Sequence, residues 1–544
     1  MNDEQRPPTP AHPPFDLSSR RASLIAALAD FLRKQRWYGG KADSLLALDI
    51  PVCIPLEASR LNAFLILVRI QYVSGRTEQY AVPLKANSPE EAGSLEVDAS
   101  HLLMVEPEGQ APRYVLSDAL EDKRFARFLL ESIRNGVSLQ GDDAQFVASP
   151  TQALQDLVDS SEGPLEPSVM RVEQSNTSVK FGNQLILKFF RRVEEGVNLD
   201  VETGVFLTGH AHFEHTPAVA GSIEIRREAK LPLTLAILQG FVQNQGDAWK
   251  YTLQALDEYF ARTESLRPPG AGDGMPSKSL IHMVAEEAPS RTRELIGPYL
   301  SSAALLGRRT AEMHVALSSY SLDPRFAPEP FSPDDRASAC DSMEQLAAQA
   351  FQLLEERLDF LEPSTREKGQ RVLPRKQEIV SRFRQLLSLP ITVQRTRLHG
   401  DYHLGQVLFT GTDFVIIDFE GEPERPLAAR RAKRSPLRDV AGMLRSFHYA
   451  ASTALERSRD LPGQPVPSNQ YLWAQYWKLW VSAQFMRGYL AAAGNAGFVP
   501  QGGDELRALL DIFLLEKAVY EVIYELKNRP AWVAIPLDGI LELL

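Results

Sequence analysis

The sequence predicts an α+β chain of two lobes, the first rich in strands and the second mainly helical. Runs of β-branched and aromatic residues, separated by turn residues, fill 45–120 and again 169–242. From 247 onward, apolar residues recur at three- and four-residue spacing, which is typical of amphipathic helices. The exception is 397–422, where a short hairpin with acidic and amide side chains interrupts the helical pattern.

Composition and periodicity divide the chain into five segments. The Pro-rich start is too poor in apolar residues to form a core, so it is expected to be a disordered leader. A helix and a small antiparallel sheet follow as an N-terminal, β-rich cap subdomain, then an acidic connector, a nucleotide-binding N-lobe and a helical C-lobe. The expected bounds are 1–16 for the leader, 17–140 for the cap, 141–168 for the connector, 169–245 for the N-lobe and 246–544 for the C-lobe.

The overall charge and the cysteine content exclude several classes of function. A formal net charge of −11 argues against nucleic acid or an anionic membrane as the main partner. Cys53 and Cys340 provide neither a disulfide framework nor a metal cluster, which is consistent with a reducing compartment. No apolar run reaches the roughly 18 residues of a membrane helix, and the leader lacks the apolar core of a secretory signal. We therefore expect a cytoplasmic protein without nucleic-acid or membrane partners.

The stretch 397–422, RLHGDYHLGQVLFTGTDFVIIDFEGE, carries the strongest chemical signal. VLF and FVII, separated by TGTD, predict a hairpin whose ends bring Asp401, Gln406 and Asp418 together. This set suits phosphoryl transfer: Asp401 takes the proton of an acceptor hydroxyl, and the other two hold Mg²⁺ against nucleotide phosphates. Protein kinases have a related pattern with Asn as the amide and Asp-Phe-Gly at the strand end. The alternative is a surface hairpin with scattered polar residues.

The N-lobe contains candidate contacts for ATP. Lys188, in LILKFF, is expected to point inward and pair nucleotide phosphates; the alternative is a solvent-facing lysine on an exposed strand. Glu202 begins an amphipathic helix and is expected to support Lys188, as the helix glutamate does in kinases. The alternative for Glu202 is simple stabilisation of the helix by its dipole.

Two further stretches of the N-lobe are weaker candidates for nucleotide contact. A polar turn without the usual glycines precedes the lysine strand, and its hydroxyl and backbone N–H groups could contact phosphates. An apolar strand then leads into a hinge whose backbone could face the adenine edge. The turn residues are Ser175, Asn176, Thr177 and Ser178, and the hinge residues are Gln239, Phe241 and Val242.

The C-terminal segment contains an aromatic stripe. Lys517, Tyr520 and Tyr524 share one helix face by their spacing, and Glu521 and Glu525 form the neighbouring stripe. Tyrosine rings stack on the C–H faces of sugars, so the stripe is a candidate carbohydrate platform. Spacing alone leaves plain core packing as the alternative.

A basic loop follows the hairpin. It contains Arg430, Arg431, Lys433 and Arg434, which form either a solvated flank or a contact for phosphate donor or product. The sequence leaves both interpretations open.

Several stretches closely resemble the bacterial maltokinases, in the aminoglycoside-phosphotransferase-like branch of the eukaryotic-type kinase fold. They are FLRKQRWYGGKADSL, EQSNTSVKFGNQLILKFFRR, FVQNQGDAWKYTL, LGRRTAEMHVAL, LHGDYHLGQVL, the DFEGEP run with its basic continuation, and EKAVYEVIYELKNRPAWVAIPL. The HGD…D pair marks only the broad superfamily, whereas DFEGEP and the C-terminal tyrosine pattern are more specific. The resemblance implies a bilobal protein-kinase-like fold with an extra cap.

The resemblance further implies ATP-dependent phosphorylation of maltose to maltose 1-phosphate, which feeds α-glucan synthesis from trehalose. It implies a trehalose synthase as partner or fusion. Asp401 would be the base, Gln406 and Asp418 the Mg²⁺ ligands, and Lys188 with Glu202 the donor-phosphate site. The disaccharide site would be lined by Lys517, Tyr520 and Tyr524, with His399 positioning the loop. The alternatives are a kinase for glucosamine or an aminoglycoside, and a non-catalytic scaffold of kinase fold.

Overall fold

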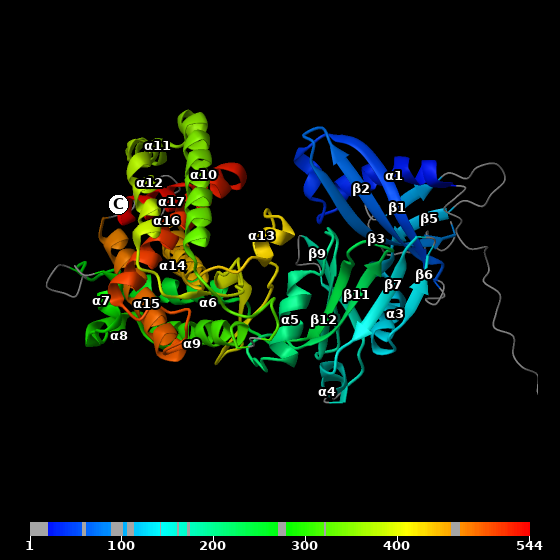
Figure 1. Cartoon of the computed structure of the whole chain (residues 1–544), viewed down its shortest axis with the longest axis horizontal. Helices are drawn as coiled ribbons and strands as arrows, with labels where there is room; N and C mark the ends of the chain where they lie inside the picture. Colours follow the sequence, from blue (N-terminus) through cyan, green and yellow to red (C-terminus); the bar gives the residue numbers. More distant parts are fainter. Residues whose placement is uncertain are drawn as a thin grey trace, which may run out of the picture. The chain divides into compact units, whose positions relative to one another are not determined.

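A computed structural model describes residues 20–56, 61–88, 102–105, 114–141, 143–159, 163–170, 175–269, 279–319, 322–458 and 468–544 (Figure 1). The chain forms two compact units. The first contains Met1–Val205 and Pro217–Phe241, and the second contains Phe206–Thr216 and Val242–Leu544. The expected disordered leader lies outside the described residues.

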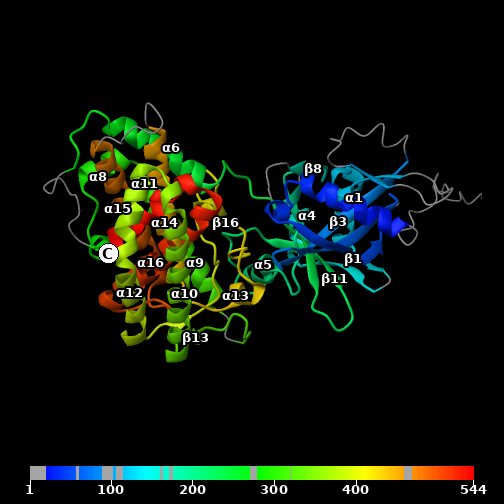
Figure 2. The ribbon, with the colours of Figure 1, turned by 90° about the horizontal axis from the view of Figure 1, so that it is seen from above.

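The first unit begins with the cap, a helix on an antiparallel sheet. Helix α1 (Arg21–Lys34) buries Leu24, Leu28 and Phe31 in one core with this sheet, and Figure 2 shows it lying along the sheet. The strand order is β1 (Leu45–Pro55), β2 (Ala63–Tyr72), β3 (Thr77–Asn87), β5 (Tyr114–Asp118) and β4 (Leu102–Val105). The expectation of a β-rich cap is confirmed.

The burial of strand β2 on both faces explains why its sequence, AFLILVRIQY, is almost continuously apolar. Ile66 and Val68 belong to the core beneath α1. Leu65 and Leu67, on the alternate face, belong to a second core shared with the following sheet. A strand buried on both faces needs no polar alternation, so the cap and the next sheet are joined by a common apolar layer.

The second sheet of this unit has seven strands, and its neighbours along the sheet are antiparallel. Helix α5 (Leu199–Gly209) follows strand β10 in the chain, and helix α3 (Lys123–Arg134) contacts β7 and β11. The order is β6 (Ser138–Gln140), β7 (Gln145–Pro150), β11 (Val219–Arg226), β12 (Leu233–Gly240), β10 (Leu185–Phe190), β9 (Asn176–Phe181) and β8 (Pro167–Met170).

The segment 141–168 differs from its expected role as a connector. It supplies strand β7, helix α4 (Ala153–Asp159) and the start of β8. Phe146 and Ala148 are buried, so β7 has the alternation of a half-buried strand. This alternation spans only six residues between polar and acidic stretches, which is why periodicity alone missed it.

The second unit is mainly helical, as predicted. Helices α9 and α15 make its most extensive helix contact, because Gly307 and Gly488 let the backbones approach closely. A Cβ at Gly307 would lie 1.9 Å from the Phe485 carbonyl oxygen. The helices are α6 (Ala248–Thr263), α7 (Leu280–Val284), α8 (Ser290–Ile296), α9 (Tyr299–Leu317), α10 (Pro333–Arg357), α11 (Pro363–Val372), α12 (Lys376–Ser388), α13 (Leu427–Arg431), α14 (Leu437–Arg457), α15 (Ser468–Ala493), α16 (Gly503–Asn528) and α17 (Ala534–Leu543).

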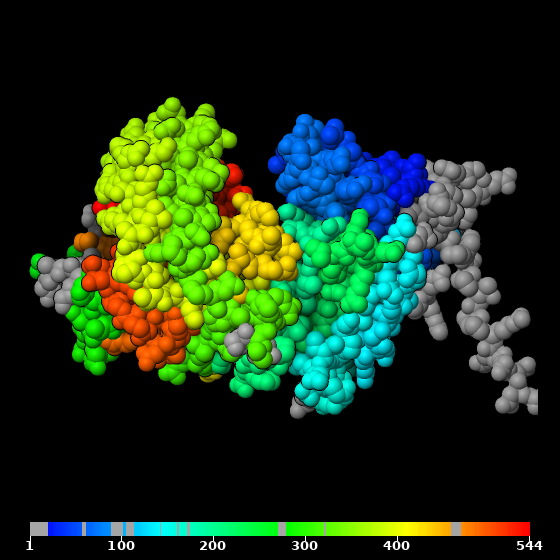
Figure 3. Space-filling view, in the orientation of Figure 1, coloured from blue at the N-terminus to red at the C-terminus, as the bar shows by residue number. Residues whose placement is uncertain are grey.

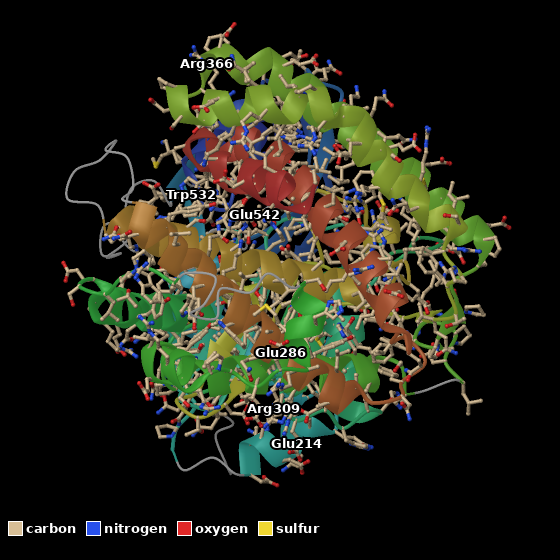
Figure 4. The ribbon with its side chains drawn as sticks, turned by 90° about the vertical axis from the view of Figure 1, so that its left-hand side faces the viewer. Glu214, Glu286, Arg309, Arg366, Trp532 and Glu542 are labelled. Carbon is tan, nitrogen blue, oxygen red and sulfur yellow. The ribbon has the colours of Figure 1, made fainter. Side chains whose placement is uncertain are left out.

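The hairpin expected within 397–422 is present. Strands β15 (Val407–Phe409) and β16 (Phe414–Ile416) pair in the register Val407↔Ile416 to Phe409↔Phe414. Arg309 of α9, labelled in Figure 4, donates to both carboxylate oxygens of Asp413, at 2.8 and 2.7 Å. This bidentate pair fixes the turn of the hairpin to the helical core. In the described part of the chain, every helix is too short or too polar to cross a membrane.

Candidate active site

The loop that carries Asp401 is held by a buried carboxylate. Asp439, in the first turn of α14, accepts the backbone N–H groups of His399 (2.9 Å) and Gly400 (3.0 Å) and a hydrogen bond from His314 (3.1 Å). Burial raises the pKa of Asp439, but the hydrogen bond and the neighbouring imidazoles outweigh this effect and hold the pKa below its usual value. An ionised Asp439 therefore fixes the backbone just before Asp401.

The ends of the hairpin bring together the two side chains predicted to hold a metal. The Gln406 side-chain amide donates to Asp418 Oδ2 at 2.8 Å, and Ile417 donates its backbone N–H to the Gln406 carbonyl at 3.0 Å. Asp418 has a φ of 68°, a left-handed conformation that is uncommon outside glycine and is enriched at functional sites. Carboxylate and amide oxygens suit Mg²⁺, so this pair fits the predicted ion.

A cavity of about 580 Å³ lies beside Asp401 in the second unit. Its volume is in the range of small-molecule sites. Three predicted substrate residues of α16 share this cavity with the predicted base. Its lining includes Asp247, Trp249, Asp401, His403, Ser446, Tyr449, Glu424, Lys517, Tyr520, Glu521, Tyr524, Glu525, Asn528, Arg529 and Trp532.

Aromatic rings form one wall of this cavity. Tyr520 and Tyr524 are stacked, with ring centroids 6.5 Å apart and 26° between their planes. Trp532, labelled in Figure 4, lies in the turn η9 (Pro530–Trp532) after α16 and stacks on Tyr449 at 6.3 Å. Flat apolar faces beside polar groups are the composition that binds sugars, and the stripe is therefore not only core packing.

Lys517 supplies a positive charge to the cavity. Its Nζ lies 2.9 Å from Glu422 Oε1 and 4.6 Å from the centre of the Tyr520 ring. Burial lowers the pKa of Lys517, but the carboxylates of Glu422 and Asp401 outweigh it, so the pKa is raised above its usual value. In turn Lys517 and Arg425 hold the pKa of Glu422 at about 2 despite burial, which by itself would raise it. Both partners stay charged at neutral pH.

Two glutamates on the cavity wall are neutralised by arginines. Arg445 donates to Glu521 Oε2 at 2.9 and 2.7 Å. Arg529 donates to both oxygens of Glu525, at 3.0 and 2.8 Å, and the Tyr449 hydroxyl donates to the same carboxylate. These carboxylates can accept further hydrogen bonds, but their charge is already matched.

His399, grouped with the substrate residues for its expected role in positioning the loop, does not line the sugar cavity. Its side chain is buried, its Nε2 lies 2.9 Å from the Ile417 carbonyl, and its ring packs 4.9 Å from that of Phe419. It is absent from the described lining of the cavity, where His403 stands instead. The backbone bonds to Asp439 turn His399 toward the hairpin, so it supports the loop.

Lys188 points into the first unit, as predicted. Its side chain is 14% exposed, and its Nζ lies 3.5 Å from Asp200 Oδ2. Asn198 accepts the backbone N–H of Asp200 at 2.7 Å, which places Asp200 and Glu202 in the first turn of α5. Glu202 was predicted to support Lys188, whereas Asp200, which lies beside the lysine, was not predicted.

The predicted phosphate-binding turn is mostly strand. Asn176, Thr177 and Ser178 belong to β9 and pair with β10. The Thr177 hydroxyl accepts from Arg191 at 2.9 Å, and Ser178 is fully buried, so these side chains serve the sheet. Only Ser175 of the predicted turn precedes the strand among the described residues. The polar composition of 175–178 predicts a turn, whereas the pairing with β10 makes most of it strand.

The expected hinge contains backbone groups that are already hydrogen-bonded. Gln239 pairs within β12. Phe241 donates its N–H to the Gln184 carbonyl at 2.7 Å, and the Val242 carbonyl accepts from the Asn244 side chain at 2.8 Å. The chain passes from the first unit to the second between Phe241 and Val242. The role of these residues in adenine binding stays a prediction.

Several cavity residues were outside the sequence-based selection. Trp249 and Trp532 come from the stretches DAW and NRPAW, whose tryptophans beside polar residues are the signal that could have found them. Arg529 precedes Trp532 in the same stretch. Glu424 follows DFEGEP directly and faces the same cavity. Their convergence depends on segments more than two hundred residues apart, which periodicity does not connect.

Comparisons with known proteins show which proteins this chain is similar to. The family model described as the maltokinase N-terminal cap domain matches residues 31–122. A glucosamine kinase of Streptacidiphilus jiangxiensis is 26% identical over 250 residues, which are 45% of this chain and 50% of that protein. A glucosamine kinase of Mycolicibacterium smegmatis is 28% identical over 146 residues, 27% of this chain and 34% of that protein. These alignments thus span half or less of the relatives' length.

A solved structure is similar over nearly the whole chain. A glucosamine kinase in complex with glucosamine, ADP and inorganic phosphate superposes with a TM-score of 0.59 at 17% identity, covering 96% of this chain and 99% of that one. The fold is therefore that of a small-molecule kinase. Within this class, the cap is of the maltokinase type.

Proposed function

We propose that the protein is an ATP-dependent kinase that phosphorylates maltose at its anomeric hydroxyl to give maltose 1-phosphate. The observation that carries the proposal is the single cavity that Asp401 shares with Lys517, Tyr520 and Tyr524. The maltokinase-type cap supports maltose as the acceptor. The complex of the similar glucosamine kinase with ADP supports a nucleotide donor.

Different side chains of the second unit bind the acceptor sugar and accept its proton. Tyr520, Tyr524 and Trp532 bind the faces of the sugar rings, and Asp401 orients the reacting hydroxyl and accepts its proton. Lys517, held charged by Glu422, hydrogen-bonds sugar oxygens.

The donor side rests on separate residues. Lys188, with Asp200 beside it and Glu202 in the same helical turn, holds phosphates of ATP. Gln406 and Asp418 hold Mg²⁺, which neutralises phosphate charge when bound.

Asp418→Ala is expected to abolish Mg²⁺-dependent nucleotide binding in a titration with a fluorescent ATP analogue, while binding of the sugar is retained.

A second acceptor, glucosamine, is favoured by the names of the similar proteins. The α16 wall of the cavity favours a neutral sugar instead, whereas the acidic Asp401 and Glu424 lie elsewhere in the same lining. A protonated amine would meet the Lys517 cation, and Glu521 and Glu525 already pair with Arg445 and Arg529. Like charges placed close together in a partly buried site repel.

The acceptor is tested by ADP release with maltose, glucose, trehalose, glucosamine and kanamycin at equal concentration. We expect the highest kcat/KM for maltose. Activity confined to an amino sugar would overturn the maltose assignment and leave the kinase assignment standing. No ADP release above the background without acceptor, for any of these sugars, would count against a kinase and favour a non-catalytic scaffold.

Asp401→Asn tests the role of the base without changing the shape of the side chain. We expect turnover to fall at least about 10²-fold, the usual contribution of a general base, with nucleotide affinity unchanged. Asp504→Asn, on a fully exposed carboxylate of α16, is the matched control. Equal turnover of the two variants would remove Asp401 from the chemistry.

The proposed product would enter α-glucan synthesis from trehalose, with a trehalose synthase as partner or fusion. This placement rests on the sequence resemblance alone. Co-elution of the purified chain with a trehalose synthase in gel filtration is the direct test of the partnership.

A further inference from the structure

The basic loop singled out in the sequence borders a second cavity that the proposed reaction does not use. This cavity, of about 410 Å³, lies between helix α10 and the segment around α13. Figure 3 shows the surfaces of these two elements, yellow-green and yellow, next to each other. Among the described residues that line it, five are basic and three are acidic; the basic ones are Arg395, Arg425, Lys433, Arg434 and Arg438.

Most of these cations have carboxylate partners. Arg438 donates to Glu516 at 2.6 Å, and Arg425 pairs with Glu422. Arg395 and Lys433 both bind Glu329, at 2.8 and 2.6 Å. These ion pairs hold the loop in place, and the neighbouring carboxylates are already bound to a cation.

Arg434 differs from the others. Within the described residues its guanidinium makes no ion pair, and its one side-chain hydrogen bond, to the Ala429 carbonyl, is long at 3.4 Å. Two backbone hydrogen bonds of 2.9 Å with Thr396 fix the backbone of Arg434, so the position of its Cα is well defined. Burial, with Arg438 and Arg425 close by, lowers the pKa of Arg434 to about 10. Glu516 and Glu422 act in the opposite direction and compensate only in part, so a buried cation beside other cations favours binding of an anion.

The space in front of Arg434 has a suitable size. A smaller cavity of about 70 Å³ adjoins the larger one, and its described lining has more cations than carboxylates. The cations are Arg425, Arg430, Arg434, Arg438 and Lys517, and the carboxylates are Glu422, Asp439 and Glu516. A water needs roughly 10–15 Å³ of such volume, so the space holds about five heavy atoms. A phosphate group has five, and arginine binds it with two parallel hydrogen bonds. Tyr520 lines this space and the sugar cavity alike.

We propose that Arg425, Arg434 and Arg438 form a binding site for a phosphate group, which adjoins the Asp401 cavity at Lys517 and Tyr520 and does not include the donor lysine. The group comes either from inorganic phosphate or from a sugar phosphate ester. The site goes beyond the proposed kinase activity, and its occupancy is measured by binding alone.

The test titrates the full chain with inorganic phosphate and, separately, with glucose 1-phosphate, by calorimetry at constant ionic strength set with chloride. We expect saturable binding of at least one of the two. Binding of both with similar affinity indicates inorganic phosphate as the source, and binding of the ester alone indicates a sugar phosphate. The absence of binding for both, or equal heats with chloride, would overturn the site.

Variants assign the binding to this cavity. Arg434→Gln is expected to weaken it at least about tenfold, because a charge-assisted hydrogen bond is lost. Arg371→Gln, on an exposed arginine of α11, should leave it unchanged. Binding should persist in Lys188→Ala, which separates this site from the donor phosphates. If Arg434→Gln does not fold, Arg434→Lys keeps the charge without the planar fork and should weaken binding severalfold. Unchanged affinity in the folded Arg434 variant would refute the proposal.

Discussion

At the scale of single residues, the site depends on charges that the cavity walls hold in pairs. Glu422 lies between Lys517 and Arg425, and its pKa is about 2 although burial alone would raise it. Asp439 is held ionised in the same way beneath the catalytic loop. Each of these carboxylates is paired before any substrate arrives, so the charges around Asp401 are already organised.

Glu422→Gln tests this organisation through pH. The folded-state pKa is lowered from 4.5 to about 2, so the carboxylate contributes stability above about pH 4.5 that is lost as the pH falls through about 2. The shift corresponds to at most roughly 3 kcal/mol. We expect Glu422→Gln to melt below the wild type at pH 7, with a gap that narrows between pH 4.5 and 2.5 in thermal scans by circular dichroism. A gap independent of pH would contradict this account.

At the scale of elements, the hairpin β15–β16 and helix α16 form the site from separate segments of the second unit's sequence. The hairpin brings Gln406 to Asp418, and α16 brings its tyrosines to Asp401. Arg309 of α9 holds the hairpin turn through both oxygens of Asp413. The three-residue strands are too short to be stable alone, so this ion pair and backbone hydrogen bonds to His215 and Gly246 hold the hairpin in place.

Arg309→Ala is expected to loosen the hairpin and lower both stability and turnover. The Arg309 side chain is 17% exposed, and loss of a partly buried bidentate pair costs on the order of 1–3 kcal/mol. Hydrogen exchange of residues 407–416 should accelerate. Arg384→Ala is the control, because Arg384 of α12 makes the same bidentate contact with Glu344 of α10 but is 61% exposed, and exposed pairs contribute little. Equal exchange in both variants would show that the clamp is not needed.

Much of the structure at the scale of elements could be predicted from the sequence. The hairpin, its two metal-type side chains and the stripe of α16 followed from alternation and spacing over fewer than twenty residues. The segment 175–178 and the connector 141–168 did not, because their strands are specified by partners elsewhere in the sheet. Asp200 was not predicted because Asp200 and Glu202 lie in the same helical turn. The sequence does not show which of the two carboxylates lies beside Lys188.

At the scale of the whole molecule, the first unit joins the cap to the nucleotide-lobe sheet. Arg191, directly after β10, donates to Asp118 of the cap at 2.5 Å and lies over the Trp37 ring at 4.8 Å. The backbone of β3 continues this junction, since Ala81 donates to the Arg191 carbonyl at 2.8 Å. The shared apolar layer on β2 makes the cap and the sheet one cooperative body.

Arg191→Met tests this cooperativity. Removing one partner of a buried pair leaves Asp118 uncompensated, at a cost of about 3–5 kcal/mol. We expect amides of β3 and of β11 to lose protection at the same, lower urea concentration in hydrogen-exchange mass spectrometry. Arg127→Met, which removes an exposed pair with Glu166, should change neither. Loss of protection in β3 alone would show that the cap unfolds independently.

The sequence by itself determined the helical and strand periodicities, the hairpin with its carboxylates and amide, and the aromatic face of α16, because each depends on neighbours along the chain. Only the tertiary structure decided that Asp401 shares a cavity with that face, that Asp200 lies beside Lys188, that His399 turns away, and that Arg434 remains without a carboxylate among the described residues. These outcomes depend on which distant segments meet and on how burial changes the free energy of a charge. The local sequence pattern contains no information on either of these.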